Sequence, residues 1–115
     1  MRKSSYTGKY RMSKIEYRCA YYYALRYHCA KQEYQALQLQ SDIDNTRVIK
    51  LKHIIDIIEQ TAKESDENLS AYILEAVTNE DVTFKRLEVT LNIPCSRNTY
   101  YDRRRRFYWL LSQKI

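Results

Sequence analysis

The sequence predicts an all-α protein, with long helical segments or a helix hairpin towards the N-terminus and a helix-turn-helix at the C-terminal end. The 115 residues include one glycine and one proline, which leaves little material for the tight turns of β-hairpins. Apolar residues recur at steps of three and four, the spacing of helices with one buried side. Two such stretches flank a short turn within residues 83–113, which is the order of a helix-turn-helix.

The chain begins with residues 1–12, which are basic, contain the only glycine and show no apolar periodicity. We expect them to form a flexible basic arm, since chain termini are often poorly ordered. The arm lacks the apolar core of a secretory signal, and no run of about 18 apolar residues occurs in the chain, so no membrane segment is expected. The odd number of cysteines, without Cys-x-x-Cys spacing, fits a reduced cytosolic compartment; they are Cys19, Cys29 and Cys95.

Residues 13–64 are expected to form a long-helix region that serves as core or for oligomerisation. Ser13 and Glu16 have the spacing of a capping box, which predicts a helix from Ser13 to about Gln40. Its apolar stripe would consist of Cys19, Tyr22, Leu25, Cys29, Ala36 and Leu39. Five tyrosines surround this stripe: Tyr17, Tyr21, Tyr23, Tyr27 and Tyr34. Stacking on nucleic-acid bases is one interpretation of them, but tyrosines at helical spacing more often build core and interfaces.

Residues 41–45 predict a break in the helix, because Asp and Asn favour turns, although a continuous helix is the alternative. Residues 46–63 predict a helix with apolar residues at heptad spacing, widened by Ile54 and Ile57; the heptad positions are Val48, Leu51, Ile55, Ile58 and Ala62. Such a stripe needs a partner along its length. The partner is either the preceding helix folded back as a hairpin or the same helix of a second protomer.

Residues 65–115 are expected to form a helical module, which ends in the helix-turn-helix. Ser65 and Asp66 are expected to cap a helix over residues 67–77, which a short link over residues 78–82 follows. In the next helix Thr83 is the expected cap and the apolar stripe is Phe84, Leu87 and Leu91. Pro94, with Asn92 and Ile93, ends that helix, and Ser96 is placed to cap the last one.

The last helix is expected to bury one side and expose a basic one. The buried side would hold Tyr100, Phe107, Leu110 and Leu111, while the opposite side would hold Arg97, Asn98, Tyr101, Asp102 and Arg105. Residues 84–115 carry eight basic and two acidic residues, and so account for the whole net charge of +6. Positive charge concentrated in this way indicates a polyanion as partner.

Double-stranded DNA is the partner that this arrangement favours. The first turns of a recognition helix approach base edges, so the expected base-reading residues are Arg97, Asn98, Tyr101 and Arg105. The expected phosphate contacts are Lys85, Arg86, Ser96, Arg103, Arg104 and Arg106. Two further partners stay open, a second copy of the chain in a homodimer and bacterial RNA polymerase.

Three stretches of the sequence resemble a known family: IPCSRNTYYDRRRRFYWLLSQKI, the preceding TFKRLEVTL and the N-terminal YRCAYYYALRY. They are similar to small RinA/ArpU-type transcription regulators, which phages and phage-related mobile islands of Gram-positive bacteria encode. The resemblance spans most of the chain and is most specific over residues 92–111. It implies a C-terminal module similar to region 4 of sigma factors, promoter binding in the cytoplasm of a bacterial host, and activation of late phage genes such as packaging and structural operons.

No catalytic constellation is found, so we expect no enzyme, cofactor or small-molecule substrate. A recombinase that attacks phosphate through Tyr100 or Tyr101 would need a larger domain to assemble its Arg and His groups. His28 and His53 lack metal-ligand spacing, and the single glycine cannot form a phosphate-binding loop. The alternative to a DNA-binding regulator is a helical protein-interaction or RNA-binding protein, in which the tyrosine-rich and heptad surfaces bind the partner.

Overall fold

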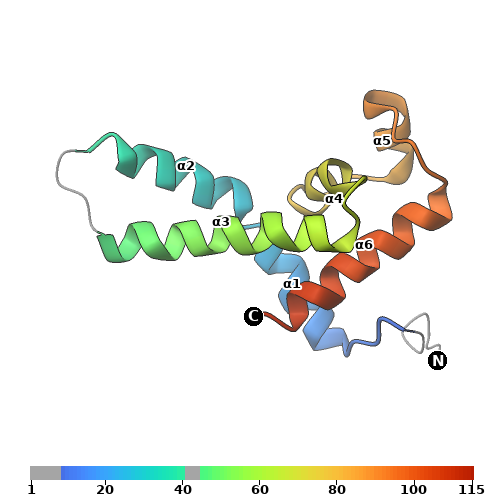
Figure 1. The fold of residues 1–115 in the computed structure, drawn as a ribbon, viewed down its shortest axis with the longest axis horizontal. Helices are drawn as coiled ribbons and strands as arrows, with labels where there is room; N and C mark the ends of the chain where they lie inside the picture. The colour runs from blue at the N-terminus through green and yellow to red at the C-terminus, as the bar shows by residue number, and fades with distance from the viewer. Residues whose placement is uncertain (1–8, 41–44) are drawn as a thin grey trace.

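The protein is all-helical in the computed structural model, which describes residues 9–40 and 45–115 (Figure 1). The helices of these residues are α1 Lys14–Ala24, α2 Tyr27–Gln38, α3 Asn45–Ser65, α4 Ser70–Val77, α5 Phe84–Leu91 and α6 Arg97–Ser112. Helix α2 lies alongside α3, whose C-terminal half packs against α4 and α6, and α1 packs against α6. Helix α5 and the N-terminal end of α6 lie at the end of the molecule opposite to α2.

The expected long first helix is wrong in one respect, because the structure divides it into α1 and α2. Its start is confirmed: the Ser13 hydroxyl accepts the backbone N–H of Glu16 at 3.0 Å, and the Ser13 N–H donates to the Glu16 carboxylate at 2.8 Å. At the break, the Arg26 N–H donates to the Tyr23 carbonyl, three residues back rather than four. The break lets α1 pack on α6 while α2 packs on α3.

The expected apolar stripe of that helix is also wrong, because the structure buries the opposite face. Ala20, Ala24, Tyr27 and Ala30 are buried. The expected stripe is exposed except for the half-buried Leu25: Cys19, Tyr22, Cys29, Ala36 and Leu39. Alanine lets neighbouring helices approach closely, and the tyrosine rings beside it supply large apolar surfaces. The expectation that tyrosines build the core is confirmed fully for Tyr27 and in part for the four that pack half-buried against the core, which are Tyr17, Tyr21, Tyr23 and Tyr34. Cys19 and Cys29 are exposed and are not core residues.

Helix α3 carries the central apolar seam, and its expected stripe is confirmed. Leu51, Ile54, Ile55, Ile58 and Ala62 are buried, while Val48 and Ile57 are half-buried. Of the two expected partners, the structure shows the intramolecular one, since α2 folds back along α3. The expected break at residues 41–45 falls almost wholly on residues 41–44, which lie outside the described residues.

A buried tyrosine joins the two helices of this hairpin. The Tyr27 hydroxyl donates a hydrogen bond to the Glu59 carboxylate. Burial, and then the bond to Glu59, raise the pKa of Tyr27 above its ordinary value of 10.0. Ionisation would remove the donor and place two negative charges side by side.

The stability of the protein is therefore expected to fall in alkali. A tyrosine whose folded pKa is raised stabilises the fold fully below the unfolded pKa of about 10 and loses that contribution as pH rises through the higher folded pKa. We expect the thermal midpoint of Tyr27→Phe to depend less on pH above about 10 than that of the wild type. Tyr34, which is half-buried two turns further along α2, supplies the matched control, Tyr34→Phe. Equal slopes for both variants and the wild type would contradict the assignment to Tyr27.

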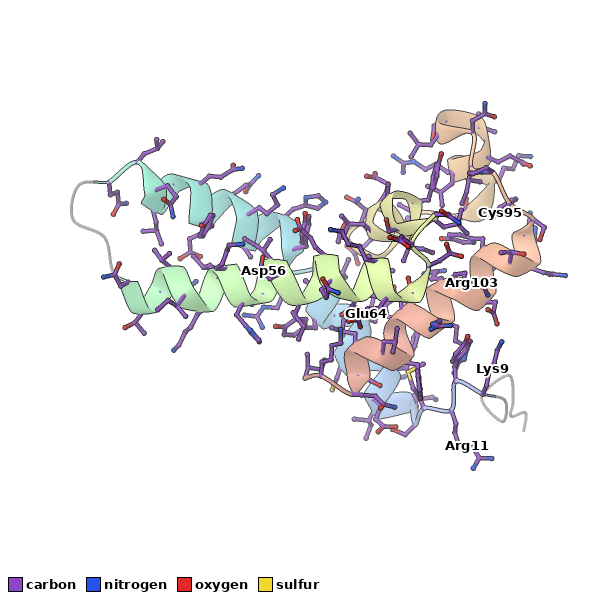
Figure 2. The ribbon with its side chains drawn as sticks, viewed as in Figure 1. Lys9, Arg11, Asp56, Glu64, Cys95 and Arg103 are labelled. Atoms are coloured by element: carbon purple, nitrogen blue, oxygen red, sulfur yellow. The ribbon has the colours of Figure 1, made fainter. Side chains whose placement is uncertain are left out.

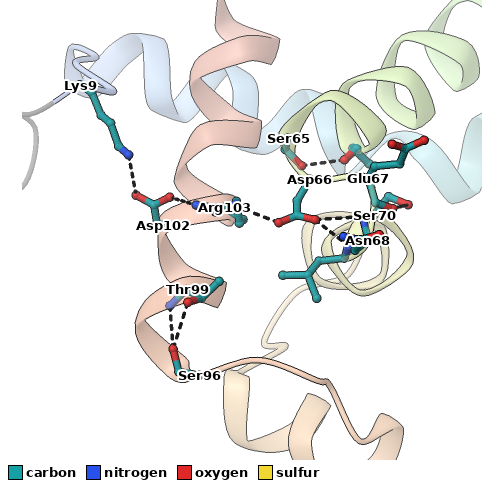
Figure 3. A network of polar contacts seen from close by, with 12 residues as sticks. Lys9, Ser65, Asp66, Glu67, Asn68, Ser70, Ser96, Thr99, Asp102 and Arg103 are labelled. Atoms are coloured by element: carbon teal, nitrogen blue, oxygen red, sulfur yellow. Dashed lines mark hydrogen bonds and ion pairs between the residues drawn. The ribbon is translucent and has the colours of Figure 1, made fainter.

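The turn between α3 and α4 differs from the expectation. Helix α4 begins at Ser70 rather than at residue 67, and Ser65 belongs to α3, where its hydroxyl donates to the Ala62 carbonyl. The Asp66 carboxylate accepts the backbone N–H groups of Asn68 and Leu69 at 2.9 and 3.0 Å (Figure 3). Asp66 thus caps a turn that precedes the helix, because a carboxylate satisfies backbone donors there as well as at a helix start.

The segment that precedes α1 lies against α6, so the prediction of a flexible arm is wrong for residues 9–12. Tyr10 and Met12 are buried, and the Tyr10 ring lies 5.8 Å from that of Trp109 on α6. Arg11 points away from the protein into solvent (Figure 2). Residues 1–8 of the expected arm lie outside the described residues.

Candidate nucleic-acid interface

Helices α5 and α6 are joined by a turn over residues 92–96 that local interactions define. The Thr83 hydroxyl accepts the Arg86 N–H at 3.2 Å and caps α5, as expected. Asn92 ends α5 in the left-handed conformation, with φ of 57°, which asparagine tolerates better than most residues. The buried Ile93 then donates its N–H to the Leu87 carbonyl at 3.4 Å. The turn is thereby fixed by backbone bonds and by one apolar anchor.

The start of α6 is also fixed, by a cap and by an aromatic contact. The Ser96 hydroxyl accepts the Thr99 N–H at 3.2 Å, which confirms the expected cap. The fully buried Tyr100 ring lies 5.6 Å from that of Phe84 on α5. Phe84 and Leu87 are buried as expected, but Leu91 is 46% exposed, because the last turn of α5 extends beyond the helices that cover its start.

Helix α6 is buried mainly in its C-terminal half, whereas its N-terminal half reaches solvent on the side away from Tyr100. Phe107, Tyr108 and Leu111 are buried where α6 crosses α1 and α3. The expected buried side is confirmed for Phe107 and Leu111, whereas Leu110 is half-buried and Tyr108 takes its place in the core. The C-terminal half of α6 is packed into the core, and the capped N-terminal half lies beside α5 (Figure 1).

The expected base-reading residues lie along one side of α6, at different depths. Arg97 and Asn98 are exposed in the first turn, and the Arg97 guanidinium lies 5.4 Å from the centre of the Phe84 ring. Tyr101 is 37% exposed, one turn further along. Arg105 is half-buried, one turn deeper again. The first three are therefore the more accessible to a partner.

Tyr101 and Arg105 face a groove between α1 and α6 that the sequence did not predict. Its volume is about 260 Å³, and it is lined by Tyr17, Tyr101, Arg104, Arg105 and Tyr108. The Tyr17 ring packs edge-on against Tyr108 at 5.2 Å. Tyr17 thus joins the candidate interface from a distant part of the sequence. The density of tyrosines near the N-terminus was a signal, but it could not indicate which of them meets α6.

Arg104 lies among the tyrosine rings of this groove. Its guanidinium is 6.0 Å from the centre of the Tyr101 ring and 5.7 Å from that of Tyr108. Cation–π contacts of this kind stabilise a partly buried guanidinium. Burial is the main cause of the raised pKa of the Tyr108 hydroxyl, which stays neutral at physiological pH. Arg104, expected to meet phosphate, therefore also has a packing role within the protein.

Arg103, another expected phosphate contact, forms ion pairs within the protein (Figure 3). Its Nε donates to Asp66 at 2.9 Å, and its guanidinium also contacts Asp102, which lies 3.8 Å from the Lys9 amine. This network ties α6 to the turn before α4 and to the N-terminal segment. The sequence predicted neither the Asp66 pair nor the position of Lys9 beside α6.

Asp66→Asn is expected to destabilise the fold by about 1–2 kcal/mol. Asparagine keeps an acceptor for the backbone of the turn but removes the charge that pairs with Arg103, and the pair is only partly shielded from water. Asp56→Asn is the matched control, since Asp56 pairs with Lys52 on the exposed side of α3 and should cost no more than about 0.5 kcal/mol. Urea unfolding measures both. Equal effects of the two substitutions would show that the Arg103 pair does not hold α6 in place.

The other expected phosphate contacts differ in exposure. Lys85 and Arg86 are exposed on α5, and Arg106 is half-buried on α6. Ser96 is exposed, although its hydroxyl is engaged in the cap. The accessible positive charge next to the start of α6 thus comes from α5 and Arg97 rather than from the run of four arginines.

The chain matches no family model, no curated protein and no solved structure. Within residues 9–40 and 45–115, no three side chains of the His, Cys, Asp and Glu types are grouped as metal ligands would be. In the same part of the chain, no helix has both the length and the apolar character required to cross a bilayer.

Proposed function

We propose that the protein is a sequence-specific regulator of transcription that binds double-stranded DNA with α5, the turn over residues 92–96 and α6 acting as a helix-turn-helix. One observation carries the proposal: the capped first turns of α6 present Arg97, Asn98 and Tyr101 to solvent, while the remainder of the same helix is anchored in the core. A recognition helix needs this combination of an accessible start and a rigid base.

The chemistry of the exposed side chains suits base edges in a major groove. An arginine presents two parallel donors to guanine, and an asparagine presents a donor and an acceptor to adenine. The contact between Arg97 and the Phe84 ring orients the guanidinium before any partner binds. Pre-orientation lowers the conformational entropy that binding costs.

The phosphate contacts would come from both sides of α6. Lys85 and Arg86 lie on α5, and Lys9 and Arg11 lie on the segment that packs along α6. Such contacts position a protein on the duplex and make its affinity depend on salt. The groove that Arg104, Arg105 and Tyr17 line lies next to Tyr101 and offers a place for one backbone phosphate.

The resemblance to RinA/ArpU-type regulators supports a narrower proposal. The protein would activate late genes of a phage or a phage satellite, for packaging or structural proteins, in the cytoplasm of a bacterial host. Direct contact with RNA polymerase is part of that proposal. A run-off transcription assay with host polymerase tests this proposal. Added protein should raise the amount of transcript from the late promoter that it regulates and not from an unrelated promoter.

A gel shift with heparin as competitor tests the DNA-binding proposal itself. The DNA upstream of the gene regulated in the native genome should be retained at a protein concentration that leaves random DNA of equal length free, at the same salt. A matched RNA duplex is the third probe, because its deep, narrow major groove does not admit a helix. Equal retention of all three would reject sequence-specific DNA binding, and stronger retention of the RNA duplex would favour the RNA-binding alternative.

A further inference from the structure

The outer face of α1 carries apolar side chains that the described part of the chain does not cover. Ile15 is 72% exposed and Tyr22 is 62% exposed, with the exposed Cys19 between them. Their spacing of four and three residues places them on one side of the helix. They line a groove of about 590 Å³ between α1 and the C-terminal end of α6, together with Glu16, Tyr23, Arg26, Ser112 and Ile115.

This surface continues beyond α1. Tyr22 and Arg26 also line a second groove, of about 270 Å³, which passes Leu25 and Cys29 and reaches Leu51 on α3. A contiguous apolar surface of this kind marks an interaction site on a water-exposed protein. We call the surface formed by Ile15, Glu16, Cys19, Tyr22 and Arg26 the α1 face.

The charges of the α1 face distinguish its partner from that of α5 and α6. The α1 face holds one acidic residue, Glu16, near one end and one basic residue, Arg26, near the other. The charges that line the groove of the α1 face therefore balance, and the exposed Arg18 flanks it on α1. The α1 face fits a partner helix that is apolar in the middle, basic at one end and acidic at the other.

A second copy of the α1 face, running antiparallel to the first, presents this arrangement of an apolar middle with a basic and an acidic end. Counted in residues along the sequence, Ile15 and Arg26 are equally far from the midpoint between Ala20 and Tyr21, and Cys19 and Tyr22 are also equally far from it. A two-fold axis at that point would set each Cys19 against the partner's Tyr22 and each Ile15 level with the partner's Arg26, which follows α1 in the break before α2. Glu16, one residue from Ile15, would then come within reach of that arginine at both ends. The capping bond to Ser13 uses one of the two Glu16 carboxylate oxygens, which leaves the other to accept from arginine.

We infer that the protein forms a homodimer through the α1 face, with the two α1 helices antiparallel. The heptad stripe of α3 is already covered within the chain by α2, so the dimer does not use it. The inference does not rest on the proposed function, and its test requires no DNA. A dimer that binds DNA would present two copies of α6 to two half-sites.

Cross-linking with a short bis-maleimide tests the geometry of the dimer. In a variant that keeps Cys19 alone, made by Cys29→Ser and Cys95→Ser, the two thiols would be about 4.5 Å apart along the axis on helices about 8–10 Å apart. This variant is expected to give a covalent dimer. The matched control keeps Cys29 alone, which is also exposed, and is made by Cys19→Ser and Cys95→Ser. Its thiols would be on the order of 20 Å or more apart, and it should stay monomeric on a denaturing gel.

Absence of a Cys19 cross-link at concentrations where sedimentation velocity shows a dimer would place the interface elsewhere. A monomer at all concentrations would remove the dimer. Equal yields from the Cys19 and Cys29 variants would show random collision instead of a specific interface.

Charge reversal provides a second measurement. Glu16→Arg and Arg26→Glu each place like charges at both ends of the interface, so each should weaken self-association about tenfold or more. Mixed together, the two variants should form a heterodimer, because one chain then carries two arginines and the other two glutamates at the facing positions. If mixing restores no dimer although both variants keep wild-type helicity, the antiparallel arrangement is wrong. If Glu16→Arg loses helicity because its capping box is removed, the self-association of Arg26→Glu and the Cys19 cross-link still test the antiparallel arrangement.

Discussion

Replacing Ile58 with aspartate is expected to remove most of the stability of the protein. Ile58 is fully buried in α3, where α3 meets the other helices of the core. An unpaired carboxylate there must be desolvated or protonated, which costs about 4 kcal/mol or more. Small domains have only about 5–15 kcal/mol in total. Circular dichroism at 222 nm during thermal unfolding should show a large drop in the midpoint or no folded baseline at all.

The same helix provides the control. Ile49 lies nine residues before Ile58 in α3 and is 67% exposed. Ile49→Asp introduces the same charge into the same helix, and it should change stability by no more than about 0.5 kcal/mol. If Ile58→Asp unfolded at the temperature of Ile49→Asp, the seam of α3 would not be the core of the protein.

Asn98→Ala and Arg97→Ala are expected to weaken binding to the cognate DNA by about 1–3 kcal/mol and to change binding to random DNA little. Both side chains are exposed in the first turn of α6, so their removal should leave the fold unchanged. Fluorescence anisotropy at matched salt, with cognate and random duplexes, measures the ratio of the two affinities. An unchanged ratio in both variants would show that α6 enters the groove in another register or not at all.

Loss of a phosphate contact should give a different result. Lys85→Ala or Arg86→Ala on α5 should weaken binding to both DNAs alike and lower the slope of log affinity against log salt by about one unit. Lys50→Ala is the matched control, because it removes one exposed positive charge from the N-terminal half of α3, at the opposite end of the molecule from α5. A slope reduced equally by Lys50→Ala would indicate a general charge effect.

Arg104 and Arg103 are expected to behave differently from the exposed cations of α5. Arg104 packs among tyrosine rings and Arg103 pairs with Asp66, so alanine at either position should lower the thermal midpoint as well as DNA affinity. Measuring the midpoint beside the salt slope separates a structural loss from a lost phosphate contact. An unchanged thermal midpoint in both alanine variants would indicate that these arginines only contact phosphate, as expected from the sequence.

The sequence alone determined the features that depend on neighbours three or four residues away. The caps at Ser13, Thr83 and Ser96 were predictable because each side chain bonds the backbone three residues further on. The buried seam of α3 was predictable because its apolar residues keep one spacing over several turns. The positive charge near α5 and α6 was visible in the same way, since it is concentrated in one stretch of the chain.

Only the tertiary structure decided which surfaces meet. The helix break at Leu25 and Arg26 carries no proline or glycine, and it follows from packing α1 and α2 against different helices. That packing selected the alanine and tyrosine face over the face with Cys19 and Tyr22, although both faces have helical spacing. It also placed Tyr17 beside Tyr108, and Asp66 beside Arg103, across distances that no local pattern encodes. Burial and pairing between such distant segments depend on how the whole chain excludes water from its apolar surface. A rule based on the spacing of neighbouring residues carries no information about this.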